Sequence, residues 1–398
     1  MKLQNAVLQL PSPSTEELQK IQPLLNQICT EIDKHNGKLD FTRFMEMALY
    51  TPDLGYYASN KAIFGEQGDF VTAPELSPLF SRCLAKQAEE VLTNLNCEGD
   101  ILEFGAGAGT MACDILMELD TLNCLPKNYL ISELSDTLRK RQQSRIATYA
   151  PHLLDRVSWI DELPESFTGV MLGNEILDAI PTHRVRFNQN GEHEQLFVGY
   201  ENSQLTWIGC NPDDEFLMSE INNIFNKFGQ GMPDHYETEI NINSIQWIKK
   251  ISQTLDQGLA LFIDYGFTES EFFRPERSEG TLMCHYKHCA HSNPLTHVGL
   301  QDITSHVNFT SIAEVAFEND MTISGFTNQT YFLVGCGLES LLNEIDINDT
   351  KQFITETQPV KVLILPDEMG ELFKVIGLTK NYDHDLMGFR TKNMLERL

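Results

Sequence analysis

The chain has few basic residues for its length. It carries 29 Lys and Arg against 57 Asp and Glu in 398 residues, a formal net charge of −28. Phosphate backbones repel such a chain, so it is not expected to bind nucleic acid. No apolar run approaches the roughly 18 residues that a membrane-spanning helix needs, so stable membrane insertion is not expected either. None of the nine cysteines forms a C-x-x-C pair, and neither an apolar secretory segment nor an Arg-rich transit peptide is present. These absences predict free thiols and a cytoplasmic location.

A glycine-rich turn lies between a short apolar strand at 101–104 and a helix that begins near Met111. Glycines occupy every second position of the turn: Gly105, Gly107 and Gly109. Glycine lets a ligand approach the backbone closely, and the helix start that follows offers unpaired N–H groups. The order of strand, glycine turn and helix therefore predicts a cofactor site.

Two cofactor types use such a turn. Dinucleotide enzymes favour G-x-G-x-x-G with an acid about 20 positions on, to hold a pyrophosphate. Here the spacing differs, and Glu103 lies just before the turn, where its carboxylate would repel a phosphate but attract a sulfonium or an amino group. The pattern therefore favours S-adenosylmethionine over NAD, and a turn without any ligand is the remaining alternative.

From residue 100 onward, strands and helices alternate along the chain. This order predicts an α/β fold with a doubly wound, mostly parallel sheet, and a helical unit before it. The expected strands are 100–104, 129–132, 156–160, 169–173, 259–263 and a last one at Val362–Leu365, with helices at 109–119, 135–149 and from Thr327. The expected domain limits are 1–98 for the helical region, 99–184 with 256–380 for the core, 185–255 for an inserted α+β cap that chooses the substrate, and 381–398 for the tail.

Ligands bind doubly wound sheets at the carboxyl ends of the strands, so acids at those ends are the candidates for cofactor contacts. Glu133 follows the second strand, where it can accept hydrogen bonds from both ribose hydroxyls. Asp161 follows the third strand, where it can accept a hydrogen bond from the adenine amino group or simply face solvent. Before the first strand, the irregular stretch 65–80 is either a connecting loop or a cover over the cofactor, and Asp69 and Thr72 are its expected contacts.

The fourth strand ends in Asn174, an expected cofactor contact, followed by Glu175 and Asp178. If this stretch is helical, the two carboxylates share a face and lie over the cofactor's methyl group. They are the candidate catalytic acids, unless they are an ordinary acid pair at a helix start.

The fifth strand leads into Asp264 and Tyr265. A buried acid is costly unless it has a partner, so Asp264 is a third catalytic candidate and Tyr265 a substrate contact. The alternative is an acid that holds a loop through hydrogen bonds. Cysteines and histidines are frequent in residues 284–306, but their spacing matches no zinc motif, so no metal is expected. His288 in this region is a candidate for the substrate pocket.

Several separate motifs follow one another in a familiar order, and with them the chain resembles the MidA-like family of S-adenosylmethionine-dependent methyltransferases. The match runs from about residue 40 to 378. The motifs are Leu49-Tyr50-x-Pro52-x-x-Gly55-Tyr56-Tyr57, Gly68-Asp69-Phe70-x-Thr72, Glu103-x-Gly105-x-Gly107-x-Gly109, Asn174-Glu175-x-x-Asp178-Ala179-x-Pro181, Asp264-Tyr265-Gly266, Gly280-Thr281-Leu282, Gln301-Asp302-Ile303-Thr304-x-His306-Val307-x-Phe309 and Met369-Gly370-x-x-Phe373-Lys374.

The resemblance implies a class I methyltransferase fold with a seven-stranded sheet, and an arginine side chain of a protein as the acceptor. The family includes a mitochondrial factor that methylates an arginine of a complex I subunit, and the present chain looks like a bacterial member. The implied partner is a protein with an accessible arginine, and a homodimer is a further expectation. A small-molecule methyltransferase and a non-catalytic, cofactor-binding assembly protein are the alternatives.

Overall fold

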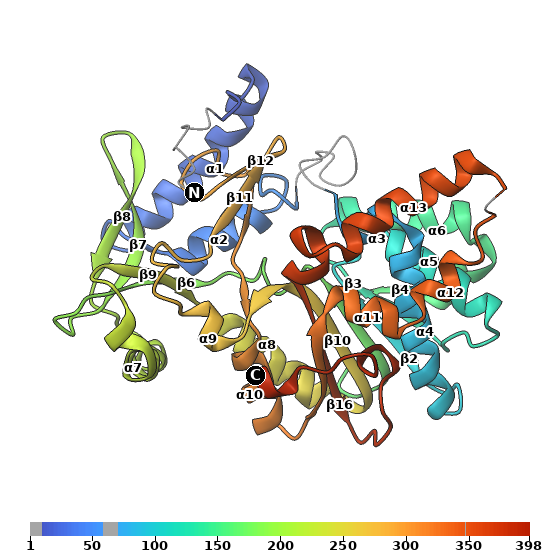
Figure 1. Ribbon diagram of the computed structural model, residues 1–398. Coiled ribbons are helices and arrows are strands. Elements are labelled where there is room, and N and C mark those ends of the chain that lie inside the picture. The colour runs from blue at the N-terminus through green and yellow to red at the C-terminus, as the bar shows by residue number, and fades with distance from the viewer. Residues whose placement is uncertain (1–9, 59–70, 347) are drawn as a thin grey trace.

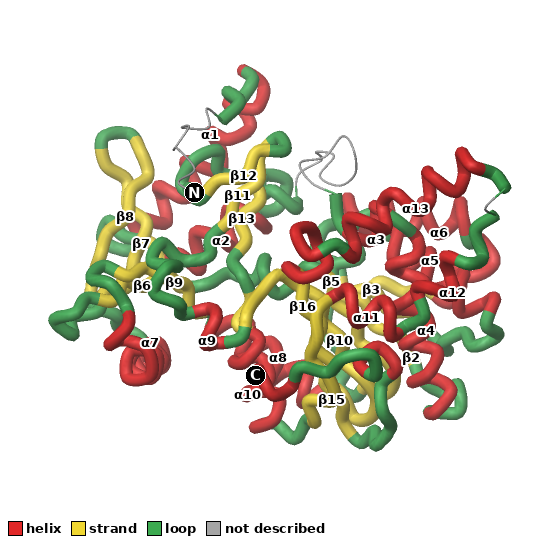
Figure 2. Tube along the Cα trace, in the orientation of Figure 1, coloured by secondary structure: helices red, strands yellow, loops and turns green. Residues whose placement is uncertain are grey.

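In the computed structural model, which describes residues 10–58, 71–346 and 348–398, a central sheet with helices on both faces lies beside a second region of helices and short strands (Figure 1). In Figure 2 the strands of the central sheet cluster at the lower right, and those of the second region lie at the left. Both regions contribute residues to the site described below.

Within the described residues, seven strands form the path of the central sheet. Their order is β15 (Thr322–Asn328), β16 (Phe373–Lys380), β10 (Leu255–Phe267), β5 (Phe167–Asn174), β2 (Asp100–Phe104), β3 (Tyr129–Ser132) and β4 (Val157–Ile160), and β14 (Val307–Asn308) pairs with the end of β10. Neighbours from β10 to β4 pair in parallel, whereas β16 is antiparallel to β10 and β15. The predicted seven-stranded, mostly parallel sheet is therefore confirmed.

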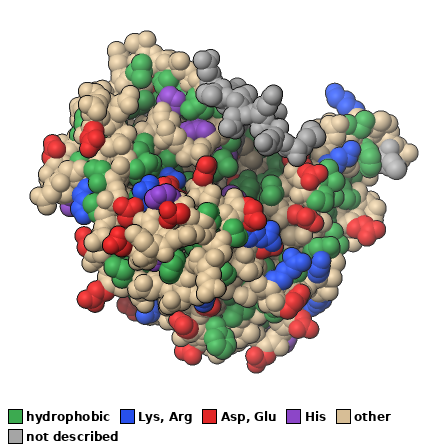
Figure 3. Space-filling model, turned by 60° about the vertical axis from the view of Figure 1, so that its left-hand side comes forward, with side chains coloured by type: hydrophobic (Ala, Val, Ile, Leu, Met, Phe, Trp, Pro, Cys, Tyr) green, Lys and Arg blue, Asp and Glu red, His purple; other side chains and the backbone are tan. Residues whose placement is uncertain are grey.

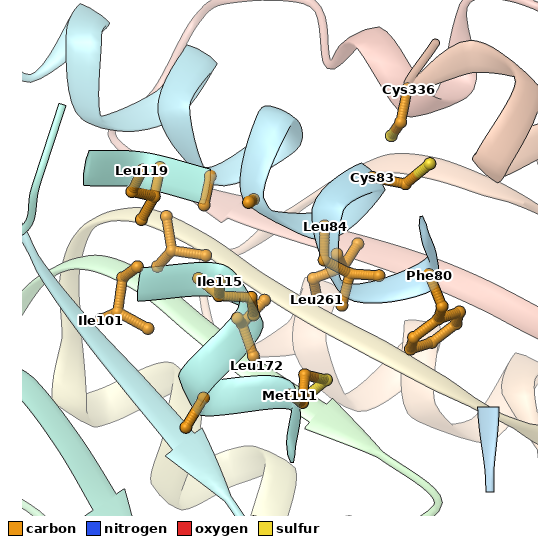
Figure 4. Close-up of a cluster of buried hydrophobic side chains, with 14 of the residues drawn as sticks. Phe80, Cys83, Leu84, Ile101, Met111, Ile115, Leu119, Leu172, Leu261 and Cys336 are labelled. Carbon is orange, nitrogen blue, oxygen red and sulfur yellow. The ribbon is translucent and has the colours of Figure 1, made fainter. Parts of the chain in front are cut away.

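Alternate residues of the strands pack on opposite faces of the sheet, as the period of two requires. On β10, Leu259 and Leu261 face one cluster of buried side chains, and Ala260 and Phe262 face another. Figure 4 shows part of the first cluster, in which Leu261 and its neighbours on the sheet meet helix side chains. The helices of this first face are α4 (Pro78–Asn94), α5 (Thr110–Thr121), α6 (Asp136–Tyr149), α11 (Gln329–Gly335), α12 (Leu338–Leu342) and α13 (Thr350–Ile364); those of the second are α8 (Ile242–Thr254) and α10 (Phe309–Glu318).

One expected strand is wrong. Residues 362–364 belong to α13, and the last strand is β16, which begins at Phe373. A short apolar run does not distinguish a buried strand from a buried helix turn. Val360 and Leu363, three positions apart, pack against the first cluster, which is the spacing of a helix face. The helix expected from Thr327 begins instead at Gln329, because Asn328 ends β15 and caps α11 with its side chain.

The second region combines the N-terminal helices with strands from later parts of the chain. A capping box of Ser14 and Glu17 opens α1 (Thr15–Lys34). An antiparallel meander is formed by β6 (His183–Phe187), β7 (Glu194–Glu201) and β8 (Gln204–Cys210), and β7 also pairs with β1 (Leu39–Asp40). Over the described ranges, no helix is both long and apolar enough to cross a bilayer. The remaining elements are α2 (Phe41–Tyr50), α3 (Ala73–Leu76), α7 (Glu215–Phe228), β9 (Tyr236–Ile240), α9 (Glu269–Phe272), β11 (Met283–Tyr286), β12 (Cys289–His291) and β13 (Asp302–Thr304).

The packing of the first face predicts a large effect of truncation at Leu261, which is 1% exposed. Leu261→Ala should lower the free energy of unfolding by about 2–5 kcal/mol, because it leaves a cavity among side chains that cannot fully close it. Leu18→Ala is the matched control, because Leu18 is 53% exposed on α1. Urea unfolding followed by circular dichroism measures both, and equal losses in the two variants would contradict this account of the core.

Candidate functional site

A cavity of about 480 Å³ lies at the carboxyl ends of β2, β3 and β5, where the predicted site residues gather. The surface is hollowed beside the grey residues in Figure 3, with hydrophobic side chains visible in the hollow. None of the described residues that line the cavity is Lys, Arg or His. Six of them are acids: Glu75, Glu103, Glu133, Glu175, Asp178 and Asp302.

The glycine turn after β2 forms one wall of this cavity. Gly105, Gly107 and Gly109 have φ of +61°, +52° and +81°, which a side chain would strain. A Cβ at Gly109 would also lie 2.9 Å from the Cα of Gln142 on α6. Gly109 precedes α5 as its N-cap, so the first N–H groups of that helix lie next to the turn. Gly105 and Gly107 line the cavity directly, whereas Gly109 holds the turn against α6.

Glu103 is fully buried at the end of β2 and lines the cavity. Its Oε2 accepts a hydrogen bond of 2.6 Å from the Tyr129 hydroxyl, but its Oε1 has no partner among the residues that the structure describes. Burial raises the pKa of Glu103 to about 8, because little around the group compensates its charge. A buried acceptor atom without a partner fits a cationic or N–H-bearing ligand at this point.

Glu133, after β3, is held by two donors. Its Oε1 accepts from the Ser135 backbone N–H at 2.9 Å and its Oε2 from the Gln142 side chain at 3.0 Å. Gln142 also donates to the Gly107 carbonyl at 3.0 Å and accepts from Trp159 at 2.8 Å. Each carboxylate oxygen can accept a second hydrogen bond, so Glu133 can still accept hydrogen bonds from two hydroxyl groups. Burial raises the pKa of Glu133.

Two of the other predicted cofactor contacts can be placed. Thr72 lines the cavity at the start of α3, together with Glu75. Asp161 does not line the cavity. Its side chain is 83% exposed and pairs at 2.6 Å with Arg139, which also donates to the Glu133 carbonyl. Asp69 lies outside the described residues.

The stretch after β5 brings Asn174, Glu175 and Asp178 into the cavity wall, but in a turn rather than the helix that was considered. Glu175 has a φ of +54°, which is incompatible with a helix start. Its carboxylate accepts from the Asn174 side chain at 3.0 Å, and burial together with the Asp264 carboxylate raises its pKa to about 8. Asp178 is 4% exposed, its Oδ1 has no partner within the described part of the chain, and burial raises its pKa strongly.

Asp264 lies behind that turn and is fully buried. Its Oδ2 accepts from three consecutive backbone N–H groups, those of residues 176, 177 and 178, at 2.8 to 3.3 Å. Its Oδ1 accepts from the Tyr265 N–H at 2.9 Å. Burial raises the pKa of Asp264, while these hydrogen bonds oppose the shift. Asp264 does not line the cavity, so the structure places it where it can hold the turn that carries Glu175 and Asp178.

The two predicted substrate contacts lie away from the cavity lining. Tyr265 packs on Phe373, with ring centroids 3.9 Å apart, and His288 is exposed at the turn between β11 and β12. Over the described part of the chain, no group of three or more His, Cys, Asp or Glu side chains is arranged to hold a metal ion.

The lining residues that the sequence did not indicate as site residues include Tyr50, Tyr57, Glu75 and Asp302. Tyr50, Tyr57 and Asp302 do stand in the motifs that carry the family resemblance, so those motifs were the available signal. Tyr57 donates to Asp302 at 2.9 Å across 245 positions of sequence, a contact that no local pattern indicates.

The raised pKa of Glu103 predicts a specific dependence of stability on pH. The pKa is about 8 in the folded protein against an ordinary value of 4.5. The unfolded chain therefore loses this proton first, and Glu103 lowers the free energy of unfolding progressively from about pH 4.5 to about pH 8. Glu103→Gln has no proton to lose, so its melting temperature relative to the unaltered protein should rise over that window. The exposed Glu201→Gln is the control. If the melting temperatures of Glu103→Gln and of the unaltered protein change with pH in parallel, the raised pKa of Glu103 is contradicted.

Comparison with known proteins identifies the family of the chain. A family described as "Putative S-adenosyl-L-methionine-dependent methyltransferase" matches residues 83–327. A protein from Burkholderia thailandensis, crystallised with S-adenosyl-homocysteine, is 36% identical with a TM-score of 0.92, covering 98% of this chain and 100% of that one.

Mitochondrial proteins are more distant relatives. The protein arginine methyltransferase NDUFAF7 of Bos taurus is 26% identical over 393 residues, which cover 90% of this chain and 83% of the relative. Its homologue in Caenorhabditis elegans is 26% identical over 375 residues, covering 86% and 83%. With its class I fold and the family match over more than half of its length, the chain belongs to this family of S-adenosylmethionine-dependent methyltransferases, and S-adenosylmethionine is its cofactor.

Proposed function

We propose that the chain methylates an arginine side chain of a protein substrate. The observation that carries the proposal is the turn after β5, which holds Glu175 and Asp178 in the wall of a cavity whose described lining residues include no basic one, close to the glycine turn. A guanidinium is a planar cation with a fork of N–H donors that suits carboxylates. The distant relatives that are named protein arginine methyltransferases support the same acceptor.

The residues around the glycine turn fit S-adenosylmethionine. The unpartnered Oε1 of Glu103 suits the positively charged end of the cofactor, and Glu133 suits the two ribose hydroxyls. Asn174, whose Oδ1 is also buried without a partner in the described ranges, offers a further acceptor in the cavity wall. Asp161 belongs to this site only if its side chain leaves Arg139.

The cofactor, when bound, supplies an electrophilic methyl group on a positively charged sulfur. The protein's part is mainly to align the acceptor nitrogen with that group, which can supply roughly 7–11 kcal/mol. Glu175 and Asp178 hold the guanidinium and concentrate its charge away from the attacking nitrogen. As the new N–CH₃ bond forms, that nitrogen gives up a proton, and the carboxylate of Glu175 in the cavity wall is the group proposed to receive it. Asp264 acts through the turn, whose backbone it holds.

The acceptor is identified by labelled-methyl transfer into a lysate of cells that lack this protein, with mass spectrometry of the labelled band. Label on an arginine of a protein is the expected result. A complex I subunit is a candidate acceptor from the family resemblance. Label confined to small molecules would replace the proposal by a small-molecule methyltransferase. Binding of the cofactor without any transfer would favour a non-catalytic assembly protein. The cytoplasmic location of the protein stays a prediction.

The role of Glu175 predicts a separation between catalysis and cofactor binding. Glu175→Gln keeps the size and hydrogen bonding of the side chain but removes its charge. Turnover of the labelled acceptor should fall by about 10²–10⁴-fold. The Kd for S-adenosylmethionine, measured by calorimetry, should stay within a few fold. The exposed Glu165→Gln is the control, and a collapse of cofactor affinity with normal turnover of the bound complex would show that Glu175 serves the cofactor instead.

A further inference from the structure

The second region of the molecule also contributes residues to the wall of the cavity. Asp302 opens β13, the edge strand of a three-stranded sheet with β11 and β12, and it is 3% exposed. It comes from a different part of the fold than Glu175 and Asp178, yet it lines the same cavity. Its negative charge contributes to the raised pKa of Asp178 and of Glu175, so the three carboxylates share one electrostatic environment.

Two stacked tyrosines complete this wall. The rings of Tyr50 and Tyr57 lie 5.6 Å apart at an angle of 22°, and both residues line the cavity. Their hydroxyls are engaged elsewhere: Tyr57 donates to Asp302 at 2.9 Å, and Tyr50 to the Ala179 carbonyl at 3.1 Å. Both hydroxyl groups are therefore engaged within the wall, and an aromatic pair beside carboxylates suits a planar cation better than a compact, strongly hydrated ammonium.

The position of Asp302 relative to the catalytic turn is set by the backbone. The N–H of Ser305, just after β13, donates to the Asp178 carbonyl at 2.9 Å. Tyr50 holds the next carbonyl of the same turn, that of Ala179. The wall with Asp302 and the turn with Asp178 are thus joined at two points. Asp178 also has a buried Oδ1 without a partner among the described residues, so the turn offers an unsatisfied acceptor.

We propose that Asp302, held by the Tyr57 hydroxyl beside the Tyr50–Tyr57 stack, is a specificity-determining residue that binds the guanidinium of the acceptor together with Glu175 and Asp178. The inference rests on the proposed function and adds the second half of its acceptor site. Three carboxylates around a planar cation can take up more of its five N–H donors than two can. The site therefore selects arginine over lysine, whose ammonium lacks both the plane and the fork.

The test uses the full chain and the peptide acetyl-Gly-Arg-Gly-amide, with acetyl-Gly-Lys-Gly-amide as the comparison. Asp302→Asn should raise the KM for the arginine peptide by about ten- to a hundredfold, the usual range for losing a hydrogen bond to a charged group. Neither kcat nor the Kd for S-adenosylmethionine should change more than a few fold. Tyr57→Phe, which keeps the ring and removes the donor to Asp302, should raise KM by a smaller factor.

The control is Asp53→Asn, an exposed acid that lies outside the cavity lining. An unchanged KM in Asp302→Asn, or an equal preference of the unaltered protein for both peptides, overturns the inference. Should Asp302→Asn fail to bind the cofactor, Tyr57→Phe decides, and an unchanged KM there overturns it too. Absence of transfer to the arginine peptide also overturns it, whereas the proposed function is decided separately by the labelled lysate.

Discussion

The constraint on which the site depends is the burial of several carboxylates without a basic partner. Burial raises the pKa of Glu103, Glu133, Glu175 and Asp178, and no described lining residue of the cavity is basic. Unpaired buried charges are costly, so a fold retains such a group only where something else compensates it. Cationic ligands do so, and S-adenosylmethionine brings one positive charge on its sulfur. Glu175, Asp178 and Asp302, which line the same cavity, can compensate the charge of a second cation.

The geometry of the catalytic turn follows from the pairing of two strands. β5 and β10 are parallel neighbours, and Ile263 pairs with Asn174, so Asp264 comes to lie behind the residues that follow β5. From there its carboxylate gathers three successive N–H groups of the turn. Glu175 has a positive φ, which costs about 1–3 kcal/mol in a residue other than glycine. The hydrogen bonds to Asp264 offset that cost and direct Glu175 to the cavity, so a buried acid outside the cavity is essential to its shape.

Local patterns in the sequence predict the first half of the site well. Apolar runs ended by acids place Glu103 and Glu133 at strand ends, and glycine spacing predicts the turn between them, because both signals lie within a few residues. The turn after β5 was harder to predict, since Glu175 and Asp178 at a spacing of three suit a helix equally well. The side chain of Asp264 decides between them, nearly ninety residues away. Residues 362–364 were assigned to a strand for a similar reason: only packing against the first cluster separates a helix turn from a strand there.

The wall with Asp302 shows the limit of such reasoning most clearly. Tyr57 and Asp302 meet across 245 positions, through a region that joins N-terminal helices to late strands. Their meeting has a consequence for the whole reaction if arginine is the acceptor, as proposed. The cavity then holds two cations before transfer and one afterwards, because the electron pair of the broken bond stays on sulfur and the acceptor nitrogen gives up a proton. That proton neutralises one acid at the same step in which one cation is lost, so the net charge of the cavity does not change. Both the reactants and the products therefore meet the requirement that buried carboxylates have compensating charge, and Asp178 and Asp302 still face a charged product.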